Sequence, residues 1–359
     1  MNKNCFGERS AVRLKAKCGA FFGSGLRVEQ ELLRGTQRGA VESESRRNAA
    51  RFLEADFELN KNCFGERSAA WLKAKICITA RAWQYILQSP DFYRNTIMAR
   101  IYPICSSSGG NSTFIGTRGH GILVDAGCSF RALKNALSLI DTDFNGIEAL
   151  FITHEHADHI KALEQIVKNT ALPIFASGGT INALKCSGKL PENAPLYDIK
   201  DGYKSAAFEV NAFATSHDSA ESVGFTVRFG KESFGVCTDT GFVTEQAEKA
   251  LSGVRTVLIE SNYDEEMLRK NLNYPPDIKR RISGNQGHLS NTDCAEFALR
   301  LLKKGARHFV LGHLSRENNT PATAKSRTER LLSDNGAVIE RDFTLCTAPV
   351  MTTGEYISV

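Results

Sequence analysis

Residues 146–160 read GIEALFITHEHADHI, and this stretch decides the fold because an apolar run ends in a group of polar side chains that can bind metals. The pattern of residues 147–153 predicts a short buried strand. Side chains at positions i and i+2 of a strand, and of the loop that leaves it, point the same way. His154 and His156 are therefore expected to face one metal ion.

A helical pattern begins at Ile160, so Asp158 and His159 lie at a helix start and are expected to reach a second metal close by. Neutral imidazole and carboxylate are good ligands for zinc and similar divalent ions. The whole chain has eight histidines, so three within six positions indicate a site rather than a polar loop. The spacing HxHxDH resembles the signature of the metallo-β-lactamase superfamily.

Three further apolar segments end in a histidine or an aspartate, the same residue types as in HxHxDH. They are FATSHD around His217, VCTDTG around Asp239 and FVLGHLS around His313. Each segment alone is weak evidence for a metal site, because a histidine at a strand end is more often a surface or capping residue. Together with HxHxDH they complete two sites for divalent ions, zinc or alternatively manganese. The expected ligands are His154, His156 and His217 for the first ion, Asp158, His159 and His313 for the second, and Asp239 as a bridge.

Two more segments are expected to support the chemistry of these sites. Glu260 follows the apolar run VLI, and His288 precedes a helix in the word GHLSN. A histidine that is not a ligand can protonate a leaving oxygen, and a carboxylate can hold its other nitrogen. Simple packing at a helix start is the alternative for His288. Asp125, which ends a predicted hairpin, is expected to support the ligating histidines.

Residues 98 to about 336 look like the YycJ/WalJ-type branch of the metallo-β-lactamase superfamily. The words that carry the resemblance are SSSGGNS, LVDAG, THEHADHI, TSHDS, CTDTG, IESNYDEEML, YPPDIKRRI, GHLSN and LGHLSRENN. Tyr263 departs from the histidine usual in the branch. The predicted fold is α+β, a four-layer αββα sandwich, with two packed sheets and helices outside.

The resemblance implies a binuclear hydrolase, most specifically a phosphodiesterase that degrades DNA as a 5′-to-3′ exonuclease. Two cations lower the pKa of a shared water and stabilise the attacking and leaving oxygens. The expected nucleophile is a metal-bridging hydroxide, because no activated serine or cysteine is evident. The expected catalytic residues are Asp158, which is also a ligand, His288 as general acid and Glu260, which orients His288.

Other functions stay open at this point. A tRNase Z-like enzyme would cleave RNA, an ester or thioester hydrolase of glyoxalase II or lactonase type would leave DNA intact, and a metal-binding regulatory protein would lack turnover. The local basic clusters favour a nucleic acid, with DNA ahead of RNA. They are Lys279 to Arg281, Lys303 and Lys304 with Arg307, and Arg316 with Lys325 and Arg327. Residues 98–359 carry 28 Lys+Arg and 30 Asp+Glu, a net charge of −2. This balance favours the alternative that the basic clusters are ordinary solvent-exposed surface and not a nucleic-acid site.

Residues 1–97 differ from the rest of the chain. The segment 2–17 recurs at 60–75 with two differences, and 17 Lys+Arg against 10 Asp+Glu give this front part a charge of +7. It is a basic arm or, as we favour, translated upstream DNA before a start at Met98 and a domain of residues 98–359. The ten cysteines are scattered without a CxxC pair, which fits a reducing cytoplasm. Neither a membrane span nor a secretory signal is expected.

Overall fold

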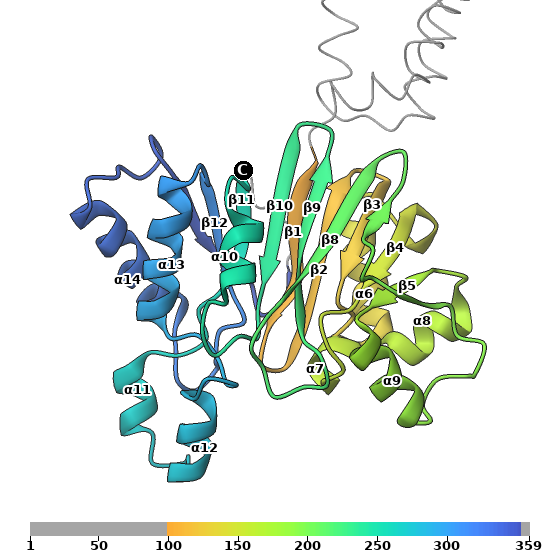
Figure 1. The fold of residues 1–359 in the computed structure, drawn as a ribbon, viewed down its shortest axis with the longest axis horizontal. Coiled ribbons are helices and arrows are strands. Elements are labelled where there is room, and N and C mark those ends of the chain that lie inside the picture. The colour runs from red at the N-terminus through yellow and green to blue at the C-terminus, as the bar shows by residue number, and fades with distance from the viewer. Residues whose placement is uncertain (1–98, 353–359) are drawn as a thin grey trace, which may run out of the picture. The chain divides into compact units, whose positions relative to one another are not determined.

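A computed structural model describes residues 99–352 of the protein (Figure 1). The expectations for residues 1–97 lie outside the described residues. Within residues 99–352, no helix combines the length and the apolar character that a membrane span needs.

The first half of this region forms a six-stranded sheet in the order β1-β2-β3-β4-β5-β6. The first three strands pair antiparallel, and β3 to β6 run parallel. Its strands are β1 (Arg100–Ser107), β2 (Gly110–Thr117), β3 (His120–Val124), β4 (Ile147–Phe151), β5 (Ile174–Ala176) and β6 (Leu196–Asp198).

The second half forms a seven-stranded sheet in the order β13-β12-β11-β10-β9-β8-β7. Strands β7 to β10 pair antiparallel, and β10 to β13 run parallel. Its strands are β7 (Tyr203–Lys204), β8 (Phe208–Ala214), β9 (Val223–Phe229), β10 (Glu232–Cys237), β11 (Thr256–Glu260), β12 (His308–Gly312) and β13 (Thr344–Thr347).

The two sheets pack face to face, and helices cover their outer faces (Figure 1). Ile122 and Phe151 of the first sheet share a buried cluster with Phe225, Val236 and Val310 of the second. Buried strands of this kind read as apolar runs because both faces of each sheet are covered. The first sheet carries α6 (Phe130–Leu139), α8 (Leu163–Asn169) and α9 (Gly178–Cys186), and the second carries α10 (Glu245–Leu251), α13 (Asn291–Lys303) and α14 (Pro321–Asp334).

Two shorter helices project beside the strand ends, as Figure 1 shows at the lower left. They are α11 (Glu265–Lys270) and α12 (Pro276–Ile282), which we call the α11–α12 arm. A single 3-10 turn, η2 (Phe144–Gly146), precedes β4, and the short helix α7 (Ala157–Ile160) follows it. The arm and α7 both lie at the edge where β4, β10, β11 and β12 end (Figure 1).

The structure corrects two local expectations. The serine- and glycine-rich word SSSGGNS, residues 106–112, is typical of a turn, but β1 reaches Ser107 and β2 begins at Gly110, and Ser106 and Ser107 are buried in the sheet. The helix after the HxHxDH stretch is divided into α7 and α8, since residues 161 and 162 separate them.

Candidate metal centre

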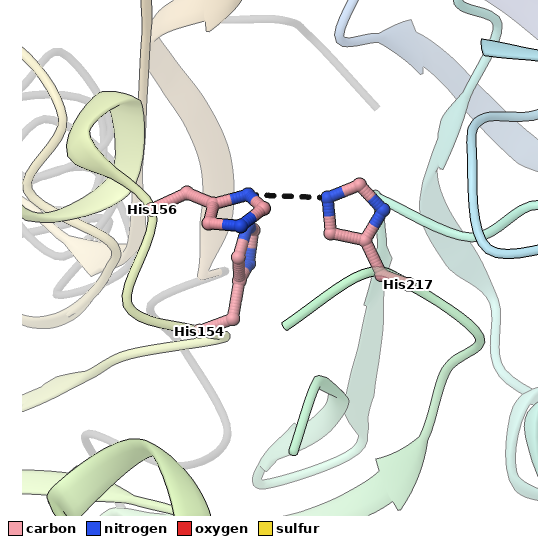
Figure 2. A group of neighbouring side chains, drawn as sticks. All are labelled: His154, His156 and His217. Atoms are coloured by element: carbon pink, nitrogen blue, oxygen red, sulfur yellow. Dashed lines mark hydrogen bonds between the residues drawn. The ribbon is translucent and has the colours of Figure 1, made fainter. Parts of the chain in front are cut away.

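Three histidines from two loops converge at the strand ends (Figure 2). His154 and His156 follow β4, and His217 follows β8. The ring centroids of His154 lie 4.6 Å from those of His156 and 5.0 Å from those of His217. His156 Nδ1 lies 3.3 Å from His217 Nε2, the contact drawn as a dashed line in Figure 2. Ligand atoms 2.0–2.2 Å from one tetrahedral ion are about 3.4 Å apart, so this spacing suits a shared ion.

The outward nitrogens of these rings are held by the protein. His217 Nδ1 donates to the Gly287 carbonyl at 3.0 Å, which fixes its proton there and directs Nε2 inward. His154 Nδ1 lies 3.1 Å from Thr153 Oγ1, while its buried Nε2 has no hydrogen-bond partner within residues 99–352. Burial and the nearby imidazoles, first that of His159, lower the pKa of His154 well below its usual range. A buried, neutral and unpaired imidazole nitrogen is what a metal ligand requires.

A second group contains Asp158, His159 and His313. Asp158 Oδ2 lies 3.5 Å from both His159 Nε2 and His313 Nε2. The far nitrogen of His159, Nδ1, is 2.8 Å from the buried carboxylate of Asp125. Asp125 also accepts the backbone N–H and the hydroxyl of Thr153 at 2.8 and 3.0 Å. Asp125 therefore orients one candidate ligand and fixes the strand end that presents another.

Asp239 lies between the two groups and is almost fully buried. Its Oδ1 is 3.4 Å from His313 Nε2 and 3.8 Å from His217 Nε2. Its Oδ2 is 3.3 Å from His159 Nε2 and forms no hydrogen bond within the described region. Oδ1 thus faces one member of each group and Oδ2 faces a second member of the Asp158 group, so this carboxylate lies where it could contact both ions.

Left-handed backbone geometry recurs at three of these strand ends. Asp125, Asp239 and His313 have φ values of 62°, 56° and 52°. This conformation is unfavourable for residues other than glycine, and such strain persists where surrounding structure enforces it, often at functional sites. Each strand turns sharply at these residues, so that their side chains face the centre.

The charges in the second group depend on one another. Burial alone would raise the pKa of the Asp158 carboxyl, but the hydrogen bonds with His159 and His313 hold it well below its usual range. Burial alone would lower the pKa of His313, but the charge of Asp239 and the contacts with Asp158 and Glu260 raise it to about 10. The buried carboxylates therefore require positive charge nearby, a requirement that divalent ions also meet while leaving the imidazoles neutral.

Glu260 and His288 lie beside these two groups, and Glu260 has a contact that the sequence did not predict. Glu260 Oε1 is 2.8 Å from His288 Nδ1 and also 2.8 Å from His313 Nδ1. Its Oε2 accepts the backbone N–H groups of Thr240 at 2.9 Å and Leu289 at 3.3 Å. Glu260 is buried, whereas the side chain of His288 is 21% exposed.

Asn111 also lies at the centre, although it was not predicted from the sequence. Its Nδ2 lies 3.1 Å from His159 Nε2 and 3.3 Å from Asp158 Oδ2, and it also donates to the Ser107 carbonyl at 3.0 Å. The word SSSGGNS contains Asn111, but an asparagine in a glycine-rich turn reads as a turn residue. Its role becomes visible only when β2 is placed beside α7.

A network of buried amides, likewise not predicted from the sequence, lies behind the centre. Asn291 Nδ2 donates to Asn319 Oδ1 at 3.0 Å, and Asn319 Nδ2 donates back to Asn291 Oδ1 at 2.8 Å. Asn319 also bonds the Ser261 carbonyl at 2.8 Å, and Asn262 bonds that of His313 at 2.9 Å. The network joins the loops after β11 and β12 to the start of α13, and so explains the paired words GHLSN and GHLSRENN.

Comparisons with known proteins concern the family of the chain. A family profile described as beta-lactamase superfamily domain matches residues 120–314. The chain is 32% identical over 235 residues to a Bacillus anthracis protein named exodeoxyribonuclease YycJ, covering 65% of this chain and 89% of that protein. It is 32% identical over 220 residues to exodeoxyribonuclease WalJ of Streptococcus pneumoniae, covering 60% of this chain and 81% of that protein.

A solved structure supports the fold. Zinc-bound PqqB from Methylobacterium extorquens matches with a TM-score of 0.53 and 13% identity, covering 71% of this chain and 99% of that chain. At this identity the match concerns the fold alone. With the two packed sheets and their outer helices, it confirms the predicted four-layer αββα sandwich.

Proposed function

The chain belongs to the beta-lactamase superfamily, in the branch of the exodeoxyribonucleases YycJ and WalJ, and from this premise we propose that it is a two-metal 5′-to-3′ DNA exonuclease. It is a metal-dependent hydrolytic enzyme of this family. One observation carries the proposal: six of the seven donor side chains lie 3.3–3.8 Å from another of the six, His154 lies within 4.8 Å of its partners, and His288 lies beside them.

The seven expected ligands fit two divalent ions, for which zinc is our first choice and manganese our second. Zinc suits a donor set of five imidazoles and two carboxylates. The proposed ligands are His154, His156 and His217 for the first ion, Asp158, His159 and His313 for the second, and Asp239 for both. When bound, two such ions would lower the pKa of a shared water and stabilise the attacking and leaving oxygens of a phosphodiester displacement.

We assign His288 the role of general acid. Its Nδ1 contacts Glu260 Oε1 at 2.8 Å, and because an ionised carboxylate only accepts, Nδ1 carries a proton. The other nitrogen, Nε2, is then available to hold a proton and to pass it to the leaving oxygen. The partial exposure of His288 agrees with contact to substrate, whereas burial of Glu260 keeps its charge directed at the imidazole.

Asp158 is proposed to act in two ways. It contacts His159 and His313, and its side chain is 26% exposed, so it faces the solvent side of the centre. A carboxylate at this place can accept a hydrogen bond from the attacking water and orient it. This is the catalytic part of its role, in addition to metal binding.

DNA as substrate is supported by the relatives' names and by charge at the strand-end edge. Arg281 of α12 is 2.6 Å from Asp218, the neighbour of His217, so the C-terminal part of α12 lies beside the centre. The cluster of Lys303, Lys304 and Arg307 lies instead between the end of α13 and the start of β12, at the opposite edge of the sheet. Two of the three basic clusters therefore remain candidates for phosphate contacts.

The test measures metal content and cleavage on the same samples. The protein is assayed on 5′- and 3′-end-labelled single- and double-stranded DNA, on RNA of the same sequence and on a thioester. We expect two metal equivalents and stepwise loss of nucleotides from the 5′ end of DNA. Asp239→Asn should lose both metal and cleavage, whereas the exposed control Asp201→Asn should retain both. Thioester hydrolysis without DNA cleavage, or preference for RNA, would contradict the proposal.

A further inference from the structure

The turn between β1 and β2 lies beside the loop that leaves β12. The His313 backbone N–H donates to Ser106 Oγ at 2.8 Å, and Ser107 and Leu314 form a parallel β-bridge. The two segments therefore run side by side away from the centre. Where they end, the guanidinium of Arg316 lies against Gly109.

Gly109 leaves room for this guanidinium. A Cβ at position 109 would be 3.0 Å from Arg316 Nη2 and 3.3 Å from Arg316 Cζ. The Gly109 backbone N–H donates to Ser107 Oγ at 3.2 Å, so the turn itself is held in place. The Arg316 side chain thus rests on a fixed, side-chain-free surface.

Arg316 is exposed and has no hydrogen-bond or ion-pair partner within residues 99–352. Arg281, on the other side of the centre, is engaged by Asp218 at 2.6 Å. The neighbouring acid Glu317 acts on Tyr274 of the α11–α12 arm, whose pKa is raised first by burial and then by that charge. An exposed guanidinium without an acidic partner, held at the rim of a centre, is suited to an anionic ligand.

The position of Arg316 can be related to the centre along the chain. Arg316 follows His313 by three positions, so their backbones are at most about 10 Å apart at about 3.3 Å per extended residue. The same hairpin places Asn111 against His159 and Asp158 at 3.1 and 3.3 Å. A nucleic-acid strand advances about 3.4 Å per nucleotide, so this reach corresponds to about three steps.

We propose that Arg316 binds a backbone phosphate of the nucleic-acid strand, about one to three nucleotides from the bond that is cleaved. The proposal rests on the proposed nuclease function and adds a phosphate subsite to it. Arg316 distinguishes a polynucleotide from an isolated phosphodiester, because only the polynucleotide presents a second phosphate at that distance. Such a contact would position the strand by its charge and geometry, and it would not depend on the base sequence.

The test compares a single-stranded oligonucleotide with bis(p-nitrophenyl) phosphate, a diester that has one phosphate. For Arg316→Gln, the ratio of kcat/KM on the oligonucleotide to kcat/KM on the small diester should fall about tenfold. The slope of log KM against log salt should decrease by about 0.7, the value for one phosphate contact on a single strand. Neutral methylphosphonates placed singly along the strand should slow the unmodified protein at one position near the cleaved bond, and this sensitivity should be lost in Arg316→Gln.

Two further variants sharpen the test. Gly109→Ala should displace the guanidinium and reproduce the oligonucleotide defect, without adding to it in the double variant. Arg228→Gln removes an exposed positive charge on β9 and should leave the ratio and the salt slope unchanged. Unchanged values in Arg316→Gln, or methylphosphonate sensitivity that persists in it, would overturn the assignment of Arg316. Failure of the unmodified protein to cleave any oligonucleotide would instead overturn the proposed function.

Discussion

At the scale of residues, the carboxylate of Glu260 contacts two imidazoles with different proposed roles. Its Oε1 lies 2.8 Å from both His288 Nδ1 and His313 Nδ1. The sequence predicted the first contact as a means of orienting an acid. Through the second contact the same carboxylate also orients a proposed metal ligand. A change at Glu260 is therefore expected to affect both proton donation by His288 and metal binding by His313.

His288→Ala should lower kcat by about 10²–10⁴-fold, the usual contribution of a placed proton donor. Metal content should remain at two equivalents, because His288 is not among the proposed ligands. Turnover and metal analysis on the same samples check this. His120→Ala, which removes an exposed histidine at the start of β3, is the control and should stay within twofold. Loss of one metal equivalent in His288→Ala would identify it as a ligand.

Glu260→Gln should reduce both turnover and metal affinity. The amide keeps the shape but places no negative charge beside His288 and His313, and loss of such support typically lowers metal affinity about 10–100-fold. Competition with a chromogenic chelator measures the affinity, and kcat at saturating metal measures the remaining defect. Full recovery of kcat at high metal would show that Glu260 serves His313 alone.

At the scale of elements, three loops behave as one unit because buried amides join them. Asn291 and Asn319 donate to each other at 3.0 and 2.8 Å, and Asn319 also bonds the Ser261 carbonyl. These loops carry Glu260, His288 and His313. The relative positions of these loops therefore depend on hydrogen bonds between buried amides.

Asn319→Ala should lower the free energy of unfolding by about 1–3 kcal/mol, because it leaves the buried amide of Asn291 without its partner. Urea unfolding of the two proteins measures this change in the free energy of unfolding. Asn193→Ala, at an exposed asparagine in the loop between α9 and β6, should change stability by less than about 0.5 kcal/mol. Equal effects in the two variants would contradict a structural role for the network.

The helices and strands that the sequence predicted share a local cause. Apolar runs and capping residues fix β11, β12 and α13, and Ser290 caps α13 by accepting the Asp293 N–H at 3.1 Å. The α11–α12 arm was not predicted, since its short helices bury almost no apolar face. Asn111 and the amide network were missed for a related reason: a buried polar contact between distant segments leaves no periodic pattern in either one.

At the scale of the whole molecule, stability is expected to depend on metal, because the buried acids of the centre rely on nearby imidazoles for positive charge. Asp239 and Glu260 are buried at the meeting point of both sheets. Added Zn²⁺ at about 100 times its dissociation constant should stabilise the folded state by about 2.7 kcal/mol. For a region of this size that corresponds to about 5–10 °C in Tm. Scanning calorimetry with chelator and with Zn²⁺ checks the shift, and Asp239→Asn should show little response.

We propose that residues 1–97 do not belong to the folded domain, on the grounds of the near-verbatim repeat and the change in composition. A protein that begins at Met98 should keep the Tm and the kcat/KM of the full chain. Side-by-side calorimetry and oligonucleotide cleavage check this. A lower Tm or weaker cleavage in the shorter protein would show that the front segment contributes.

The division of the strands between the two sheets has a consequence for biosynthesis. The first sheet is completed by residue 198 and the second begins at residue 203, so each sheet is one continuous half of the described region. Four of the seven proposed ligands come from the first half and three from the second. During translation, all six strands of the first sheet are therefore synthesised before His217, Asp239 and His313. The proposed pair of metal sites is therefore complete only after translation has supplied His313.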